Sequence, residues 1–81
     1  MAGEIDRILT LIKETGGVEE VGLEDDFYEA GFSSVNALTL LLELETTFDV
    51  SIPDDKFVEA RTPLALKTMI VDLKHRISSD E

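Results

Sequence analysis

Apolar residues recur along most of the chain at helical spacing, interrupted by one long segment without it. Near the N-terminus they stand three or four positions apart, which places them on one helix face: Ile5, Ile8, Leu9 and Ile12. Gly16 and Gly17 follow. They predict that the first helix ends at about Thr15, because glycine commonly follows a helix C-terminus.

The segment Gly16 to Ser33 has no comparable periodicity and predicts a long loop. Apolar and aromatic residues within it are candidate anchors onto the core: Val18, Val21, Leu23, Phe27 and Tyr28. Loops of this length are uncommon in compact domains and are often functional.

A second helix, predicted from about Ser34 to Phe48, carries more apolar residues than one face needs. At 100° per residue one stripe is expected to be core: Ala37, Leu40, Leu41, Leu44 and Phe48. A second stripe, here called the apolar strip, is rotated well away from it: Val35, Leu38 and Leu42. The helix is either buried on most sides, or the apolar strip docks a partner, bordered by Thr39, Glu43 and Glu45.

The segment from Asp49 to Pro53 is predicted to end the second helix, because Pro53 disfavours helical geometry at Ile52. A short helix over about residues 54–59 is predicted next, with Phe57 and Val58 facing inward.

Thr62 and Pro63 have the form of a helix N-cap followed by a proline in the first turn. They predict a last helix from about Pro63 to Ile77, with one apolar face: Leu66, Met69, Ile70, Leu73 and Ile77. The tail over residues 78–81 is expected to fray. The chain therefore predicts an all-α fold, a small four-helix bundle with three main helices and one short one, as a single domain over residues 1–81.

Length and composition limit the possible functions. A chain of 81 residues buries only about 60% of its unfolded surface, which leaves little room for a deep catalytic cleft. Cysteine is absent, so no disulfide or protein thiolate is available. No apolar run approaches the roughly 20 residues needed to span a membrane. The acidic start lacks the basic region of a secretory signal, so we expect a cytoplasmic protein.

Charge is strongly unbalanced, with 18 acidic residues against 7 basic ones and a net charge of −11. No Lys or Arg occurs between Lys13 and Lys56. This charge disfavours nucleic acid and anionic membranes as partners. It favours a partner with a basic docking patch, although acidity can also serve solubility alone.

The run Gly31-Phe32-Ser33-Ser34-Val35 joins the acidic loop to the second helix. A hydroxyl at that junction either caps the helix or serves as the attachment point of a covalent group. Taken alone, the run favours the cap.

Beyond this run, the chain resembles the acyl carrier protein family. The resemblance rests on Asp26-Phe27, the run from Gly31 to Val35, the Leu-rich helix with Glu45 and Phe48, Ile52-Pro53-Asp54, and Thr62-Pro63. It covers nearly the whole chain and needs no gap between Gly31 and Pro53. The family fold is a four-helix bundle with a long first loop, which agrees with the periodicity.

The resemblance implies a covalent cofactor, 4′-phosphopantetheine, delivered from coenzyme A by a phosphopantetheinyl transferase. Carried over, it implies attachment at Ser34, with Ser33 and Gly31 beside it. Gly31 would allow a tight turn, and the helix N-terminus would favour the phosphodiester. The arm carries cargo as a thioester, so no enzyme activity is expected.

Partners are implied as well: the transferase, an acyl- or aminoacyl-loading ligase, and a downstream synthase or transferase. The docking residues are expected to be Val35, Leu38, Thr39, Leu42, Glu43 and Glu45, on a chain that is monomeric.

Departures from the family pattern indicate a specialised carrier. Ser33 stands where aspartate is usual, and Val35 where leucine is more familiar. Thr39 and Thr46 occupy positions that are often acidic in fatty-acid carriers. These differences favour a polyketide, nonribosomal-peptide, unusual-lipid or aminoacyl pathway over housekeeping fatty-acid synthesis.

Alternatives remain at this point. Ser33 could carry the arm with Ser34 in the first helical position, or neither serine is modified and the chain is an acidic helical adaptor that binds through the apolar strip.

The lone histidine, His75, is predicted to be a solvated side chain, so no catalytic residue is predicted. An EF-hand starting at Asp26 fails at its ligand positions, so no metal site is expected beyond loose binding by acidic loop residues.

Overall fold

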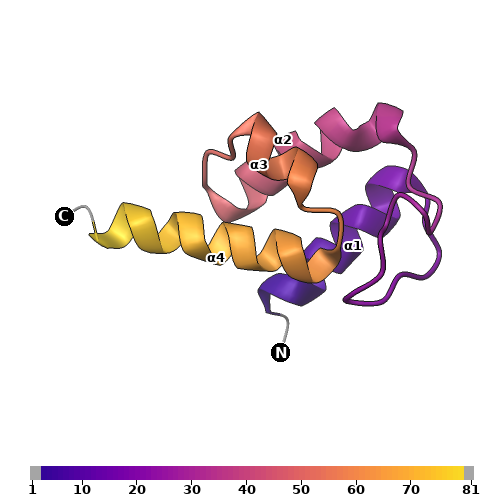
Figure 1. Cartoon of the computed structure of the whole chain (residues 1–81), viewed down its shortest axis with the longest axis horizontal. Helices are drawn as coiled ribbons and strands as arrows, with labels where there is room; N and C mark the ends of the chain where they lie inside the picture. Colours follow the sequence, from indigo (N-terminus) through magenta and orange to yellow (C-terminus); the bar gives the residue numbers. More distant parts are fainter. Residues whose placement is uncertain (1–2, 80–81) are drawn as a thin grey trace.

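The computed structural model describes the backbone of residues 3–79 and the side chains of residues 3–75. Its elements are α1 (Glu4–Gly16), the 3-10 turn η1 (Ser34–Asn36), α2 (Ala37–Phe48), α3 (Asp54–Glu59) and α4 (Pro63–Ser79). No strand occurs within residues 3–79. The predicted all-α fold, with three main helices, one short helix and a long first loop, is confirmed (Figure 1).

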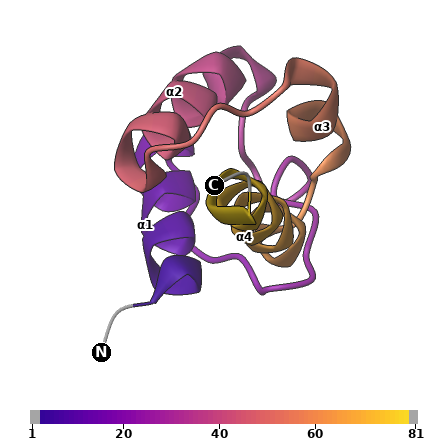
Figure 2. The ribbon, with the colours of Figure 1, turned by 90° about the vertical axis from the view of Figure 1, so that its left-hand side faces the viewer.

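The helices surround a single apolar core. Seen end-on in Figure 2, α4 lies between α1 on one side and α3 on the other, with α2 above. The most deeply buried aliphatic side chains come in pairs from three helices: Ile8 and Ile12, Leu40 and Leu44, Leu66 and Ile70. Each pair is spaced by four residues, which places both members on one helix face.

Two helices end at residues with left-handed backbone. Gly17, after α1, has φ 69° and donates its N–H to the Lys13 carbonyl at 2.9 Å. The helix extends one residue past the predicted Thr15. Asp49, after α2, has φ 56°, so α2 ends at Phe48 as predicted. The cause lies at Asp49 itself, well before Pro53.

Two predictions about α3 and α4 need correction. Phe57 of α3 is buried, but Val58 is 64% exposed and does not face the core. The predicted N-cap of α4 is present, since the Thr62 Oγ1 accepts the Ala65 N–H at 3.0 Å. The helix continues to Ser79 rather than ending at Ile77. Of the tail predicted to fray, residues 78 and 79 are helical, and residues 80 and 81 lie outside the described residues.

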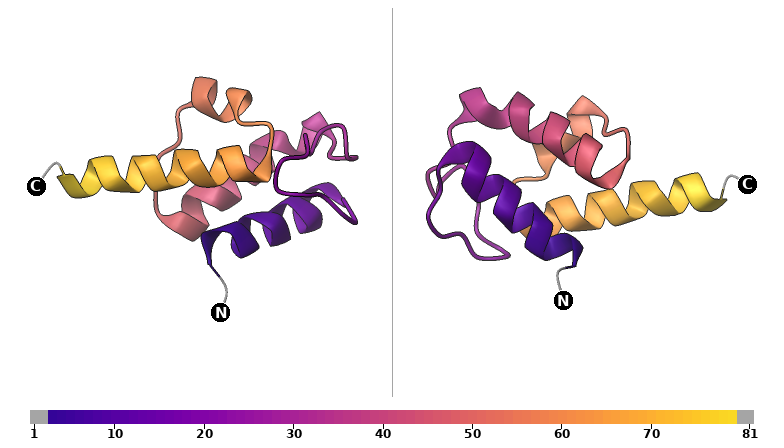
Figure 3. Two further views of the ribbon diagram at one scale, coloured as in Figure 1. Left: turned by 60° about the horizontal axis from the view of Figure 1, so that its bottom comes forward. Right: turned by 180° about the vertical axis from the view of Figure 1, so that it is seen from behind.

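The long loop after α1 packs along the link between α3 and α4. The Phe27 N–H donates to the Arg61 carbonyl and the Leu64 N–H donates to the Leu23 carbonyl, both at 3.0 Å. Val18 and Phe27 are buried anchors, as predicted, whereas the Leu23 side chain is 45% exposed and contributes its backbone instead. The loop lies at one end of the bundle in both views of Figure 3. Among the described residues, no helix combines the length and apolar character needed to cross a lipid bilayer.

Candidate functional site

Ser34 occupies the first position of η1, where the long loop enters the second helical segment. The prediction of one α-helix from Ser34 is wrong in its first turn, which is a 3-10 turn that continues directly into α2. Asn36 has φ −94° and ψ 2°, outside α-helical geometry. Ser, Val and Asn are weak helix formers, which accounts for the tighter turn.

The two adjacent serines differ in their contacts. Ser33 has an extended backbone and its Oγ accepts the Val35 N–H in a long hydrogen bond of 3.4 Å. Ser33 therefore caps the turn, one of the roles that the sequence left open. Ser34 is exposed, and its hydroxyl has no hydrogen-bond partner among the described residues.

A single helical turn over residues 26–31, here called the Asp26 turn, leads into the serines. The Asp26 Oδ1 accepts the N–H of Tyr28 at 2.9 Å and that of Glu29 at 3.3 Å. Gly31 closes the turn at φ 119°, a backbone conformation that favours glycine. The expected tight turn at Gly31 is therefore present.

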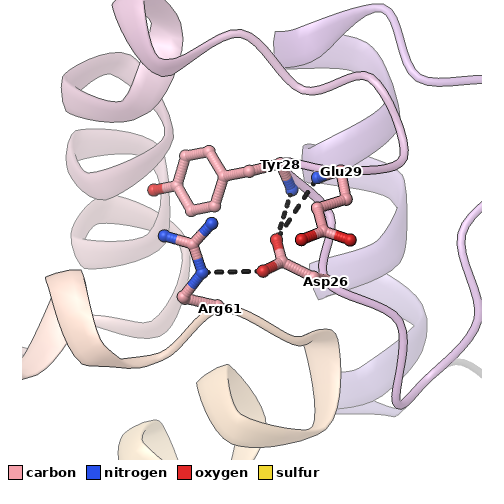
Figure 4. A network of polar contacts seen from close by, with 4 residues as sticks. All are labelled: Asp26, Tyr28, Glu29 and Arg61. Atoms are coloured by element: carbon pink, nitrogen blue, oxygen red, sulfur yellow. Dashed lines mark hydrogen bonds and ion pairs between the residues drawn. The ribbon is translucent and has the colours of Figure 1, made fainter.

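Arg61, from the link between α3 and α4, pairs with the Asp26 turn (Figure 4). Its Nε donates to the Asp26 Oδ2 at 2.7 Å, and its guanidinium lies 4.7 Å from the centre of the Tyr28 ring. The hydrogen bond from Arg61 holds the pKa of Asp26 below its ordinary value and raises that of Arg61. The sequence shows no cation near the acidic loop, and folding supplies this one.

Three aromatic rings connect the Asp26 turn to the core. Phe27 and Phe32 meet edge to face with centroids 5.4 Å apart, and Tyr28 lies 4.7 Å from Phe27 and 5.7 Å from Phe32. Partial burial raises the pKa of Tyr28. Phe32 is also pressed against Gly16, where an added Cβ would overlap its ring. Phe32 is therefore fixed two residues before Ser34.

The apolar strip faces solvent. Val35 is 82% exposed, Leu38 65% and Leu42 53%, while the other stripe of α2 is buried or half-buried. The reading of a helix buried on most sides is therefore wrong. Thr39 and Glu43 beside the strip are exposed as well.

Glu45 has a structural contact that the sequence analysis did not foresee. Its Oε2 accepts the Ile52 N–H at 2.9 Å, which ties α2 to the segment before α3. Of the residues expected to dock a partner, Glu45 is thus half-buried and already engaged within the fold.

Among the described residues, no group of three or more His, Cys, Asp or Glu is placed to hold a metal ion. Of the acids considered for loose binding, which are Glu24, Asp25 and Asp26, two make contacts within the fold. Asp26 pairs with Arg61, and Asp25 accepts the Gly22 N–H at 2.8 Å. His75 is exposed. A groove of about 610 Å³ lies between α3 and α4, and Ser34 is not among its lining residues.

A family model described as "Phosphopantetheine attachment site" matches residues 6–70. The chain belongs to this family. The match includes the Asp26 turn, both serines and the whole of α2. The covalent cofactor predicted from the sequence is therefore confirmed, and the domain is a carrier rather than a catalyst.

Two curated relatives of this phosphopantetheine attachment domain are similar over part of its length. Gramicidin S synthase 2 of Brevibacillus brevis and that of Aneurinibacillus migulanus are each 36% identical over 56 residues, or 69% of this chain. The match covers 1% of each relative, so the chain spans about one hundredth of their length.

One solved structure shares the fold of this attachment domain. It is the solution structure of a non-covalent extended docking domain complex of the Pax NRPS, PaxA T1-CDD with PaxB NDD. The TM-score is 0.79 at 19% identity, with 90% of this chain and 70% of that chain covered.

The residues of this attachment domain fit the prosthetic group. An alcohol that accepts a phosphoryl group has to be accessible, and both serines are exposed. The Ser33 Oγ also accepts the Val35 N–H, whereas the Ser34 hydroxyl has no partner among the described residues. When attached, the group supplies a thiol that holds cargo as a thioester, a function that this cysteine-free chain cannot supply itself.

Arg61 and the structural contact of Glu45 are what the sequence analysis missed. Arg61 stands 35 positions from Asp26, and no spacing rule links them. The sequence indicated this region only through Asp26, because an aspartate side chain often accepts the backbone N–H two residues ahead and so caps a turn.

Proposed function

We propose that this chain is a carrier domain of the nonribosomal-peptide type, primed with 4′-phosphopantetheine on Ser34, which presents an acyl or aminoacyl cargo to partner enzymes. The observation that carries the proposal is the family match over residues 6–70 around an exposed serine at the start of η1. Similarity to gramicidin S synthase 2 and to the Pax NRPS complex supports this pathway class over the other specialised ones.

Ser34 is favoured over Ser33 by the contacts of the two side chains. Ser33 retains the capping function of an N-cap residue, and attachment there would add a bulky group to the oxygen that accepts the Val35 N–H. Ser34 can be modified without breaking a hydrogen bond of the described residues. The unmodified adaptor is disfavoured, because the family is defined by phosphopantetheine attachment.

Priming is the reaction in which Ser34 takes part. The Ser34 Oγ bonds to the phosphorus next to the pantetheine of coenzyme A, the pyrophosphate bond breaks, adenosine 3′,5′-bisphosphate leaves, and the hydroxyl proton passes to a base on the transferase. The carrier contributes an exposed hydroxyl held on an ordered turn, so the transferase has one geometry to recognise.

Intact-mass measurement tests this assignment. The chain is incubated with coenzyme A and a broad-specificity phosphopantetheinyl transferase, alongside Ser34→Ala and Ser33→Ala as a matched pair. The wild type and Ser33→Ala should each gain one phosphopantetheine, and Ser34→Ala none. No gain in the wild type would overturn the function, and a gain that survives Ser34→Ala would overturn the residue assignment.

Docking is assigned to the apolar strip, with Thr39 and Glu43 at its border. Exposed leucines on a small domain are candidates for partner contact when they gather in one patch. We expect Leu38→Ala to weaken binding to the loading ligase, while Leu64→Ala, an exposed leucine of α4, leaves it unchanged. Surface plasmon resonance on the two variants measures this. Equal affinities for both variants and the wild type would show that the apolar strip is not part of the docking surface.

A further inference from the structure

We propose that Arg61 is a positioning residue for the priming of Ser34, acting through Asp26 and Tyr28 on the turn that leads into the serine. The inference rests on the proposed attachment at Ser34. Arg61 touches neither serine, and its effect has to pass through the Asp26 turn.

The first link is the pair of contacts that the Arg61 guanidinium makes with the Asp26 carboxylate and the Tyr28 ring. Its Nε donates to the Asp26 Oδ2 at 2.7 Å, and its guanidinium faces the Tyr28 ring at 4.7 Å. The Asp26 side chain is 25% exposed and that of Arg61 51%. An exposed ion pair alone contributes little, but here the same guanidinium holds two neighbouring residues of one turn, so their relative position is constrained.

The second link lies within the turn. Asp26 uses its other oxygen, Oδ1, to accept the N–H groups of Tyr28 and Glu29. Figure 4 shows both sides of this carboxylate in use, one toward Arg61 and one toward the turn. Rotation of the carboxylate away from Arg61 would therefore also misalign its hydrogen bonds to the Tyr28 and Glu29 N–H groups. Arg61 thus fixes the orientation of the group that organises the turn.

The third link reaches the serines. The Phe32 N–H donates to the Phe27 carbonyl at 2.9 Å, and the Gly31 N–H to the Tyr28 carbonyl at 3.3 Å. Tyr28 and Phe32 also meet edge to face. The direction in which the chain leaves Phe32 toward Ser34 follows from these contacts. In a looser turn Ser34 would occupy several positions, and a smaller fraction of the carrier would have Ser34 in the position that the transferase binds.

The expected kinetic effect follows from the fraction of carrier molecules in which Ser34 is correctly placed. When a binding-competent state is only partly populated, the apparent affinity falls in proportion. Arg61→Gln should therefore lower kcat/KM for priming about fivefold, given the usual strengths of such ion-pair and cation–π contacts. The effect should appear in KM, with kcat little changed, because the transferase supplies the chemistry.

The experiment uses the full chain and steady-state kinetics with a broad-specificity transferase, at a temperature where circular dichroism shows each variant folded. Arg7→Gln is the charge-matched control, since Arg7 lines a hollow beside the C-terminal end of α2, remote from Ser34. Asp26→Asn weakens the same ion pair by changing its acidic partner, because asparagine keeps an oxygen that can cap the turn and loses the negative charge. Arg61→Lys should recover part of the effect.

Amide hydrogen exchange separates positioning from general stability. In Arg61→Gln, the amides of residues 32–35 should exchange faster relative to those of Ile8 and Ile12 in α1. A variant that is merely less stable would speed all of these together, and that result would overturn the proposal. So would an unchanged KM in folded Arg61→Gln, or an equal rise in Arg7→Gln. If the wild type itself takes no phosphopantetheine, the proposed function has failed rather than the role of Arg61.

Discussion

Two glycines near the serines are required for different physical reasons. Gly16 lacks space, because Phe32 presses on it. Gly31 has open space around it but a φ of 119°. One position is restricted by a neighbour and the other by its own backbone, a distinction that the sequence does not reveal.

Replacing each glycine with alanine should expose this difference. We expect Gly16→Ala and Gly31→Ala each to lower the free energy of unfolding by about 1–3 kcal/mol, from overpacking and from backbone strain respectively. Phe32→Leu should reduce the cost of Gly16→Ala and leave that of Gly31→Ala unchanged. Urea unfolding of the two double-mutant cycles measures both couplings. Equal coupling in both cycles would contradict the assignment.

Asp26 should give the fold a specific acid sensitivity. Arg61 lowers the pKa of Asp26 from its ordinary 3.8, so the unfolded chain binds this proton more readily than the folded one. The stabilisation is complete above pH 3.8 and is lost as the pH falls through the lower folded-state pKa.

The matched comparison is between wild type and Asp26→Asn. The wild type should have the higher Tm at about pH 6, and the gap should shrink at about pH 3, because the unfolded chain binds the Asp26 proton below the ordinary pKa of 3.8. Thermal melts followed by circular dichroism at the two pH values give the result. A gap that widens on acidification would show that Asp26 does not stabilise through its charge.

At the scale of the helix, α2 divides its two apolar stripes between core and solvent. Sequence periodicity predicted both stripes because an α-helix has a fixed angle per residue. It did not predict the 3-10 turn at Ser34 or the left-handed Asp49, since each depends on one residue's local backbone. Val58 was misplaced because a six-residue helix offers too few positions for periodicity to define a face.

Glu45 and Glu43, both on α2, should differ in what their loss does. Glu45→Ala removes the acceptor of the Ile52 N–H, so we expect it to lower the free energy of unfolding by about 1–2 kcal/mol. Glu43→Ala removes an exposed carboxylate and should change stability by less than about 0.5 kcal/mol. Chemical denaturation compares them. Equal stabilities would mean that the Glu45 contact contributes nothing to the fold.

For the whole molecule, the resemblance and the helix count followed from the sequence, whereas the contact that orders the long loop did not. Helices arise from local spacing, but the pairing of Asp26 with Arg61 joins residues 35 positions apart. Such a contact exists only once α3, α4 and the loop are packed together. Ser34 could therefore be proposed in advance as the attachment residue, but the residues that hold the turn before it could not.

Net charge should govern how quickly partners find this carrier. With a charge of −11, the chain attracts a basic docking surface over a distance that salt shortens, to about 8 Å at 0.15 M ionic strength. We expect kcat/KM for priming to fall as salt is raised, and to fall less steeply when Glu19 and Glu20 are both changed to Gln. Initial rates across a salt series test this, and a flat profile in the wild type would contradict it.

Tyr28 is the chain's single tyrosine, and tryptophan is absent. Near-ultraviolet absorption and fluorescence therefore come mainly from one ring, the ring that Arg61 covers in the Asp26 turn. Tyr28 is therefore an intrinsic optical reporter on the turn that leads to Ser34, the proposed attachment residue. We expect priming of Ser34 to change the tyrosine emission of the isolated carrier, a change that needs no added dye and no engineered label.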